Sequence, residues 1–417
     1  MAFVGKSIVF NGENTMIFFC LLQIWAQLPE VELSPTVFPK PEYSKTPKGA
    51  SVIWLSDARY HLSRMELYFD QGIEGCKAEI GAAWDKEKAR HRHELLKLGS
   101  YTQFVMQSNS AFAQIAIPQG KEKRALQILS KMLSAMRPSS SSHRQKLDYS
   151  SHSGVVREFL YGSKEDKKNN CRQAYQEWLQ RMTPRFAFVG KMDMGELIPF
   201  LDSLWTKPSL PKTFFSSTRK KTQVRSAMLI HSMDLGPQMR LTGLIPIPSD
   251  VEDAALKMYT EILGGGFTSR LTSSLREEKG WLYHIETDIE RTLSGRYIRI
   301  STQLSIADFL SVHDAIQEIL RSMVNISQRE MRKVQNVQTR VQRENLFDGQ
   351  YLISALRDPE TFDRMEVYER AMRTLSTVEI ESLAEIVLAQ ELMLIVSGKQ
   401  EEIEKIWSGS WEIYNLR

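Results

Sequence analysis

The twenty residues Gly264–Tyr283, GGGFTSRLTSSLREEKGWLY, combine residue types that can hold and polarise a substrate. Three consecutive glycines allow another backbone to approach closely, and the pattern after them predicts a charged helix that ends at Gly280. Arg276 lies near the end of this helix, and Tyr283 lies just beyond the glycine. A guanidinium and a phenol at one end of a helix can both donate hydrogen bonds to a carbonyl oxygen that gains negative charge.

The glycines and the hydroxyl residues also have an ordinary structural interpretation. A helix is predicted over 251–263, and a glycine directly after it can end the helix in the left-handed conformation. Thr268 or Ser269 can then cap the next helix, which is predicted over 268–279. Three glycines exceed what a helix end needs, so the sequence also predicts one wall of a substrate groove. The residues predicted to line this groove are Gly264, Gly265, Gly266, Phe267, Thr268 and Ser269.

Arg276 and Tyr283 leave two alternatives open. In the first, Arg276 forms an ion pair with Glu277 or Glu278, and Tyr283 packs against the protein. In the second, both side chains face a substrate and stabilise its carbonyl oxygen. Taken alone, these residues favour the first alternative.

The chain has eight histidines, but their spacing does not suit a metal site. His91 and His93 lie two positions apart on a predicted helix, where their side chains point about 200° apart. Two histidines that bind one metal from a single helix are four positions apart. Neither HExxH nor HxxEH occurs, so we expect no metal and no cofactor in this chain.

Other sequence features exclude further classes of function. The GxSxG, Walker A and dinucleotide-binding motifs do not occur. A net charge of +4 over 417 residues, with basic and acidic residues interleaved, does not indicate nucleic-acid binding. Cys20, Cys76 and Cys171 are far apart and odd in number, so we expect neither a disulfide framework nor a cysteine zinc site.

The apolar run MIFFCLLQIWA, residues 16–26, has the length of a signal-peptide core. The run is too short to span a membrane, and no other segment is apolar enough to do so. A polar, proline-rich stretch follows it. We therefore expect export, to the periplasm in a bacterium. The alternative is a cytoplasmic protein whose N-terminal helix packs on its body.

Two segments of the chain resemble each other and suggest an internal duplication. FAFVGKMDMGELIPFL and LMLIVSGKQEEIEKIW both combine an apolar strand, a Gly-Lys turn and an amphipathic helix. We match Gly190 to Gly398 and Leu67 to Leu244, which leaves 123 residues in the first copy and 154 in the second. The first copy is therefore about 31 residues shorter, which is roughly a helix and its loops.

Strands that follow each other closely and helices that cluster indicate an α+β fold. We predict two related halves, each a mainly antiparallel mixed sheet covered by helices on one face. The predicted divisions are an export-like segment and linker over 1–47, a first half over 48–205, a linker over 206–221 and a second half over 222–417.

The motifs GGGFTSRL, LREEKG and GWLY, in this order, resemble the second half of the insulinase, pitrilysin and mitochondrial-processing-peptidase family of zinc metallopeptidases. Weaker similarity extends over residues 48–407. The resemblance implies two related α+β halves, with zinc held on the first half by HxxEH and a distant glutamate. It also implies that an arginine and a tyrosine seven residues apart, on the second half, bind and polarise the substrate. Arg276 and Tyr283 match that pair in type and spacing.

The first half departs from the pattern of this family. In the family, HxxEH precedes the segment that corresponds to ELLKLGS (94–100). Here the chain runs from residues 72–83 to ELLKLGS without this motif. We expect the helix that the first copy lacks to be missing at this point. Some members of the family divide the labour between two similar chains, one with the zinc motif and one with the Arg/Tyr pair. This sequence resembles the second kind.

The resemblance therefore predicts the zinc-lacking subunit of a heterodimeric metallopeptidase. The expected partner is a homologous HxxEH-bearing chain that holds the zinc, and the expected substrate is a peptide or unfolded polypeptide held as an added strand. One alternative is a peptidase-like binding or scaffold protein without a catalytic role. Another is a homodimeric peptidase with unrecognised ligands, for which His91, His93 and Glu94 are the candidates.

Overall fold

The structure, a computed structural model, describes residues 37–57, 59, 61–73, 76–106, 110–139, 152–153, 155–156, 170–205, 228–292, 295–357, 362 and 364–413. These residues belong to one compact unit, Thr36–Arg417. The predicted signal-like run at 16–26 and the predicted linker at 206–221 lie outside the described residues. No described helix is both long enough and apolar enough to cross a bilayer.

The first half contains a six-stranded sheet. Its strands, in spatial order, are β1 (Glu42–Lys45), β2 (Ser51–Leu55), β6 (Arg185–Val189), β3 (Leu62–Phe69), β5 (Ala111–Pro118) and β4 (Tyr101–Met106). Neighbouring strands are antiparallel except for β2 and β6, which are parallel. The helices of this half are α2 (Lys77–Arg90), α3 (Arg92–Leu98), α4 (Glu122–Ala135), α6 (Cys171–Arg181) and α7 (Met194–Leu204).

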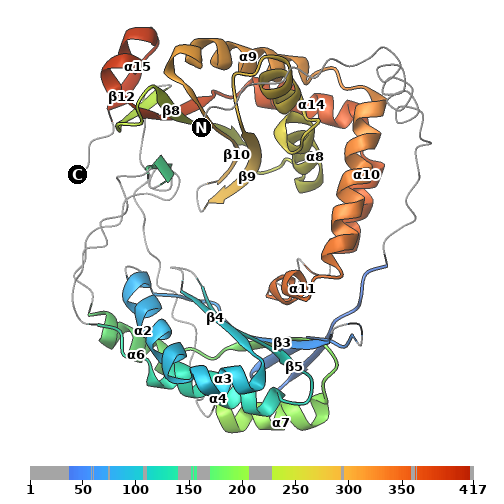
Figure 1. Ribbon diagram of the computed structural model, residues 1–417. Coiled ribbons are helices and arrows are strands. Elements are labelled where there is room, and N and C mark those ends of the chain that lie inside the picture. The colour runs from blue at the N-terminus through green and yellow to red at the C-terminus, as the bar shows by residue number, and fades with distance from the viewer. Residues whose placement is uncertain are drawn as a thin grey trace, which may run out of the picture. The chain divides into compact units, whose positions relative to one another are not determined.

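These five helices lie on one face of the first sheet (Figure 1). Alternate residues of β3 explain this arrangement, because Met65, Leu67 and Phe69 point to one face and are buried against the helices. Trp178 of α6 packs on Phe69, with ring centroids 4.6 Å apart. The period of two along the strands therefore produces the predicted layer of helices on one side of a sheet.

The second half repeats this architecture. Its strands, in spatial order, are β12 (Trp411–Ile413), β7 (Met228–Ser232), β11 (Met393–Gly398), β8 (Gln238–Ile247), β10 (Gly295–Ser305) and β9 (Ile285–Thr292). Its helices are α8 (Asp253–Gly264), η1 (Thr272–Glu278), η2 (Ile306–Asp308), α9 (Phe309–Ser322), α10 (Gln328–Asn345), α11 (Gly349–Ala355), α13 (Met365–Thr374), α14 (Thr377–Leu388) and α15 (Gln400–Ile406).

The two sheets have the same strand order, which confirms the two related halves. The order β2-β6-β3-β5-β4 corresponds to β7-β11-β8-β10-β9, and the parallel pair β2 and β6 corresponds to the parallel pair β7 and β11. The outermost strands differ, because β1 is antiparallel to β2 whereas β12 is parallel to β7. The duplication predicted from two matching segments therefore extends over both sheets.

The first copy is shorter than the second, but most of the missing residues are not where we expected them. Between β3 and β4 the first half has 31 residues, 70–100, and the second half has 37 between β8 and β9, 248–284. The larger difference lies between β5 and β6, with 66 residues, 119–184, against 87 between β10 and β11, 306–392. The expectation of a missing helix before ELLKLGS was therefore wrong. Helix α2 fills that place, and it carries no histidine.

The second face of each sheet is covered in part by a segment from the other half of the sequence. On the first sheet, Leu352, Ile353 and Leu356 at α11 pack on residues of β2 and β6 such as Ile53 and Ala187. On the second sheet, Val155 and Val156 pack on residues of β7, β8 and β11, which are Leu229, Leu244 and Ile395. Each sheet therefore buries both faces over part of its area.

A buried polar cluster accompanies the second of these contacts. The ring of His152 lies 2.7 Å from Ser397 Oγ through Nδ1 and 2.9 Å from Thr242 Oγ1 through Nε2. His231 Nδ1 contacts the same serine oxygen at 3.0 Å. Burial lowers the pKa of His152 to about 4, and the nearby charges of Arg240 and His231 act in the same direction.

A disulfide joins two of the three cysteines, contrary to the sequence-based expectation. Cys76 precedes α2 and Cys171 begins α6, and their Cα atoms lie 5.5 Å apart in a disulfide that closes 95 residues of sequence. Both residues are buried beside the helices of the first half. The count of cysteines suggested no pairing because the fold, and not the spacing along the chain, brings the two helix starts together.

Candidate active site

The first of the three glycines is the last residue of α8 and the other two follow it, and none of them has the left-handed conformation that was expected. Gly265 ends the helix with φ of −80°, and no positive φ occurs at Gly264 or Gly266. A side chain at Gly264 would come within 2.6 Å of Thr287 Oγ1 and 2.8 Å of its Cγ2 on β9. A side chain at Gly265 would meet the carboxylate of Glu261. Two of the glycines therefore serve close packing within this chain.

Beyond this packing, the Gly-rich segment opens to the surface. Gly266 has no atom within 4 Å of where a side chain would begin, and residues 265–268 are exposed. Ser269 is buried, and its hydroxyl donates to Gly266 O at 2.6 Å and to Thr272 Oγ1 at 2.9 Å. The helix that follows begins at Arg270 and continues as the π-helix η1. The accessible part of the predicted groove wall is thus Gly265 to Thr268.

Arg270 anchors the start of the helix that carries the candidate site. It donates to both carboxylate oxygens of Glu330, each at 2.8 Å, and also to Ser322 O and Asn325 O at 2.6 and 2.8 Å. A two-point arginine–carboxylate contact fixes orientation as well as position. Sequence reasoning missed this role, and the Arg-Leu pair after the serine was its only signal. Leu271, the next residue, is fully buried.

The helix itself is wider than an α-helix. Residues Thr272–Glu278 form a π-helix, and the amide of Lys279 donates to Ser274 O, five residues back, at 3.1 Å. Such turns are rare and concentrate at functional sites. Gly280 ends the helix with φ of +63°, a conformation that a residue with a side chain rarely adopts. The predicted helix and its stop at Gly280 are therefore confirmed, with a different hydrogen-bond pattern.

The turn at Gly280 brings Arg276 and Tyr283 together. The guanidinium carbon of Arg276 lies 5.8 Å from the ring centroid of Tyr283 and 5.6 Å from that of Phe267. Both distances suit a cation–π contact, which contributes about 0.5–1 kcal/mol at an exposed site. The arginine therefore contacts two aromatic rings, one from the Gly-rich segment and one from beyond the helix.

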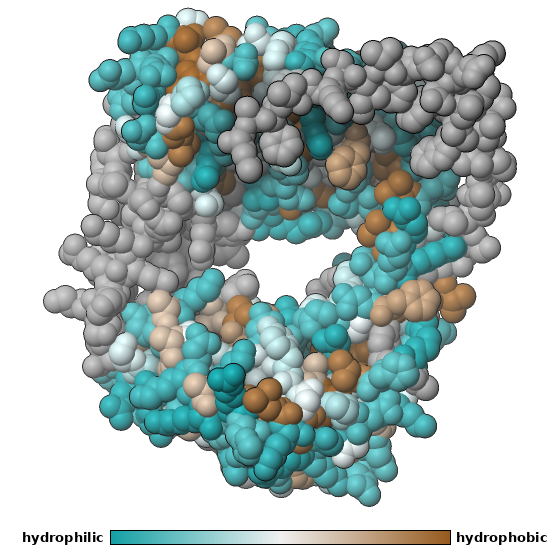
Figure 2. Space-filling view, in the orientation of Figure 1, coloured by the Kyte–Doolittle hydropathy of each residue, from teal (hydrophilic) through white to brown (hydrophobic). Residues whose placement is uncertain are grey.

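These aromatic rings are open to solvent. Tyr283 and Phe267 are exposed by 88% and 78%, more than any other aromatic residue that the structure describes. Figure 2 shows a mainly hydrophilic visible face, on which hydrophobic residues form small groups. Exposure of this degree is common for single aliphatic residues but is unusual for two aromatic rings around one cation. The structural alternative required Tyr283 to pack against the protein, and the exposed ring does not do so.

The structural alternative also required an ion pair of Arg276, and a weak one is present. Arg276 Nε lies 3.3 Å from Glu277 Oε1, and the two side chains are exposed by 32% and 59%. Ion pairs between exposed side chains contribute little because water screens them and the side chains lose freedom. The remaining guanidinium nitrogens are not engaged by this pair, so Arg276 can still donate to an incoming oxygen.

The pair lies at the beginning of an edge strand. Tyr283 precedes β9 by two residues, and β9 is the last strand of the second sheet, with β10 as its neighbour among the described strands. An extended peptide can add to such an edge through main-chain hydrogen bonds. A carbonyl group of that peptide near the start of β9 would lie beside the guanidinium and the phenol. Arg276 and Tyr283 therefore lie beside the start of an edge strand.

The first half does not bring metal ligands together within the described residues. No group of three or more histidine, cysteine, aspartate or glutamate side chains there could hold a metal ion. His91 lies between α2 and α3 with Nδ1 3.0 Å from Glu87 O, and Glu94 pairs with Arg124 at 2.6 Å. The candidates of the homodimer alternative, His91, His93 and Glu94, therefore do not converge.

Comparisons with known proteins agree with this fold. Residues 168–338 match the family model of the peptidase M16 inactive domain, a range that includes the Gly-rich segment, Arg276 and Tyr283. A search of curated proteins found no match.

Solved structures also resemble the chain. A peptidase M16 inactive domain from Pseudomonas fluorescens has a TM-score of 0.68 and 14% identity, over 87% of this chain and 98% of that one. A protease from Helicobacter pylori has a TM-score of 0.69 and 12% identity, over 86% and 100%. The periplasmic protease PqqL from Escherichia coli has a TM-score of 0.67 and 12% identity, over 92% of this chain and 50% of that one.

Proposed function

We propose that this chain, whose residues 168–338 match the family model of the peptidase M16 inactive domain, is the zinc-lacking subunit of a two-chain metallopeptidase. A homologous subunit with HxxEH would hold the zinc ion, which supplies an activated water when bound. This chain would supply the residues that hold the peptide and stabilise the oxygen of the bond to be cleaved.

The observation that carries the proposal is the placement of Arg276 between Phe267 and Tyr283 at the start of edge strand β9. A peptide that adds to β9 receives its backbone hydrogen bonds from the strand. The guanidinium and the phenol hydroxyl then donate to the carbonyl oxygen as it becomes an oxyanion.

Two observations support an exported location for this subunit. The disulfide between Cys76 and Cys171 suits an oxidising compartment, because disulfides are rare where thiols are kept reduced. One of the structural relatives, PqqL, is described as a periplasmic protease. Together with the signal-like run at 16–26, these observations favour the bacterial periplasm.

Reconstitution tests the proposal. The purified chain, a homologous HxxEH-bearing subunit, and their mixture are each assayed on an unfolded polypeptide and on a quenched fluorescent peptide. We expect this chain alone to bind no stoichiometric zinc and to cleave nothing, and the mixture to cleave both substrates. Cleavage by the isolated chain that a chelator abolishes would overturn the proposal.

A second candidate function is a binding or scaffold protein that keeps the fold without contributing to catalysis. The description of the matching family model as an inactive domain favours it. The two candidates differ in one result. A scaffold would support the partner's activity equally well with Arg276→Ala or Tyr283→Phe, whereas a catalytic subunit would not.

A further inference from the structure

A different site lies on the second face of the first sheet, where strand register places a charged row beside an apolar row. In the charged row, Lys45 is opposite Ser51 on β1 and β2, and Arg185 is opposite Tyr68 on β6 and β3. Partners in register point to the same face of a sheet. These side chains therefore form one line across four strands.

The neighbouring row is mainly apolar. Tyr43 of β1 is opposite Ile53 of β2, and Ile53 is beside Ala187 of β6 in the parallel register. Further along the same row, Ala187 is opposite Glu66, whose carboxylate is covered by the end of α11. The segment at α11 thus covers part of this face and leaves the part near β1 open.

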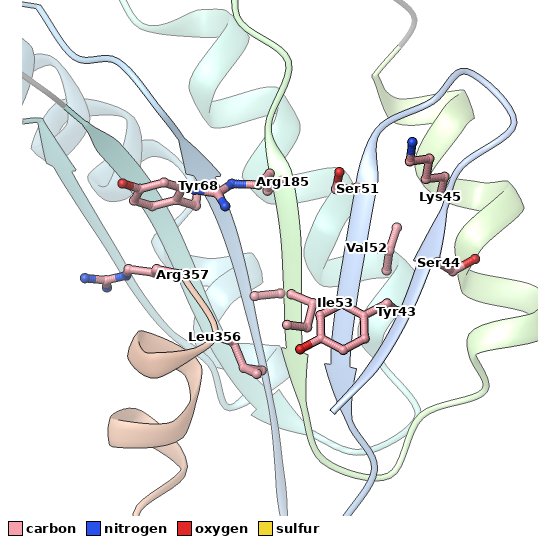
Figure 3. Close-up of a pocket in the computed structure, with 11 residues that line it drawn as sticks. Tyr43, Ser44, Lys45, Ser51, Val52, Ile53, Tyr68, Arg185, Leu356 and Arg357 are labelled. Atoms are coloured by element: carbon pink, nitrogen blue, oxygen red, sulfur yellow. The ribbon is translucent and has the colours of Figure 1, made fainter. Parts of the chain in front are cut away.

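The open part forms a pocket of about 300 Å³ (Figure 3). Figure 3 shows Arg185 and Tyr68 together at one end, with Tyr43, Ile53 and Leu356 toward the other. The residues that line it are Tyr43, Ser44, Lys45, Ser51, Val52, Ile53, Tyr68, Arg185, Ala187, Leu356 and Arg357. The floor is aliphatic, and the rim carries hydroxyls and cations.

The charge of this lining is one-sided, because it includes three cations and no acidic residue. Arg357 is neutralised by the buried Glu66, at 2.6 and 2.9 Å, and Arg185 pairs with Asp70 at 2.5 Å. Lys45 is exposed and makes no ion pair within the described part of the chain. Two arginines are thus compensated by acids outside the pocket, and the lysine is not.

Arg185 is oriented by its neighbours at this end of the pocket. Its guanidinium carbon lies 4.8 Å from the ring centroid of Tyr68, and its Nε is buried with no hydrogen-bond partner among the described residues. This Nε is closed to solvent, but the side chain as a whole is 33% exposed, so its terminal nitrogens can reach an anion in the pocket. Together, Lys45 and Arg185 favour an anion at the charged end of the pocket.

We propose that this pocket binds the C-terminal end of a peptide whose last residue is apolar. The terminal carboxylate accepts hydrogen bonds from Lys45 and Arg185, and the last side chain lies on Ile53, Ala187 and Leu356. A volume of about 300 Å³ is at the lower end for ligand pockets. It suits one small amphipathic anion better than a long acyl chain. The choice of a peptide as the ligand rests on the proposed function. The preference for an anion with an apolar side chain rests only on the residues that line the pocket.

Fluorescence anisotropy with the full chain, without any partner, tests this binding. The probe is Gly-Gly-Ser-Gly-Leu with an N-terminal dye, compared as the free acid and as the C-terminal amide. We expect the acid to bind about tenfold or more tightly than the amide, since charged hydrogen bonds are lost in the amide. The same acid with Gly in place of Leu should bind more weakly.

Matched variants locate the site. Lys45→Glu reverses the charge inside the pocket and should weaken binding of the acid about tenfold. Lys40→Glu makes the same charge change at an exposed lysine outside the pocket and should leave the affinity unchanged. Ser51→Trp fills the pocket from an exposed position and should abolish binding. Thermal melting of each variant verifies that it is folded.

Several results would overturn the proposal. These are no binding of the acid, equal affinity for acid and amide, unchanged affinity in Lys45→Glu, or displacement of the peptide by octanoate as effectively as by the unlabelled acid. The assay also separates this site from the proposed function. Carboxylate-dependent binding without partner-dependent cleavage contradicts only the proposed function, and cleavage without carboxylate preference contradicts only the pocket.

Discussion

The guanidinium of Arg276 lies 5.8 Å from the ring of Tyr283, across the turn that Gly280 makes at the end of a π-helix. The turn thereby brings the π-helix that carries Arg276 into contact with Tyr283, which follows it. The guanidinium carbon of Arg276 also lies 5.6 Å from the ring centroid of Phe267, which belongs to the Gly-rich segment. This arrangement fixes the direction of a flexible side chain before any substrate is present.

Phe267 should therefore affect catalysis through Arg276. In the reconstituted two-chain enzyme, Phe267→Leu removes a contact worth about 0.5–1 kcal/mol and should lower kcat about two- to fivefold with little change in KM. Phe347→Leu is a matched control, because Phe347 is also exposed and lies 5.0 Å from Arg59. Equal kinetics for the two variants would show that the ring does not position the arginine.

Substitution by alanine should destabilise the protein at Gly264 but not at Gly266. Gly264→Ala places a methyl group against Thr287 and should lower the free energy of unfolding by about 1–3 kcal/mol. Gly266→Ala meets no atom within 4 Å and has no positive φ to lose, so its stability should change by less than about 0.5 kcal/mol. Urea denaturation measures both. A stable Gly264→Ala would contradict the close packing of α8 and β9.

How far the sequence predicts this fold can be judged from the two halves. The period of two in β3 and the strand–turn–helix segments at Gly190 and Gly398 predict the α+β halves and their duplication. The segments that cross between the halves, at Val155 and Leu352, were not predicted. Their apolar residues pack on the sheet of the other half, and only the tertiary structure shows this contact.

The candidate site was predictable to a similar degree. The types and spacing of Arg276 and Tyr283 suggested that they could meet, and the turn at Gly280 shows how they do. The role of Gly264 was not predictable, because it depends on Thr287 in a strand that comes later in the chain. The pairing of Cys76 with Cys171 was missed for the same reason.

The buried ring of His152 predicts a loss of stability in acid. Its pKa is lowered to about 4 in the folded chain from 6.5, so between these values the unfolded chain binds a proton that the folded chain does not. The contribution of this group is complete above pH 6.5 and decreases as the pH falls toward 4. Between pH 7 and pH 5 the loss should be about 2 kcal/mol.

Denaturation of the wild type and of His152→Gln at both pH values measures this contribution. The variant lacks the titrating ring, so its free energy of unfolding should fall by about 2 kcal/mol less between pH 7 and pH 5 than that of the wild type. Parallel losses in the two proteins would contradict a buried, neutral His152. The comparison cancels other groups that titrate in the same range.

The disulfide should make stability sensitive to reductant. Its reduction, or Cys76→Ser, should cost about 2–4 kcal/mol of unfolding free energy, because the unfolded chain regains the freedom of a long loop. Cys171→Ser should match Cys76→Ser, and the double variant should be no worse, since each change breaks the same bond. A denaturation midpoint that reductant leaves unchanged, with all cysteines titrating as free thiols, would contradict the pairing.

If half of the active site lies on this chain, as we propose, Arg276 and Tyr283 must contribute to the turnover of the two-chain enzyme. The most direct test is the kcat of the HxxEH-bearing partner when saturated with wild-type chain, with Arg276→Ala or with Tyr283→Phe. Lys279→Ala, a cation on Trp281 after the same helix, is the control. The account predicts that loss of either oxyanion donor lowers kcat about 10²- to 10³-fold while the control stays near wild type. Equal kcat for all four assemblies would contradict it.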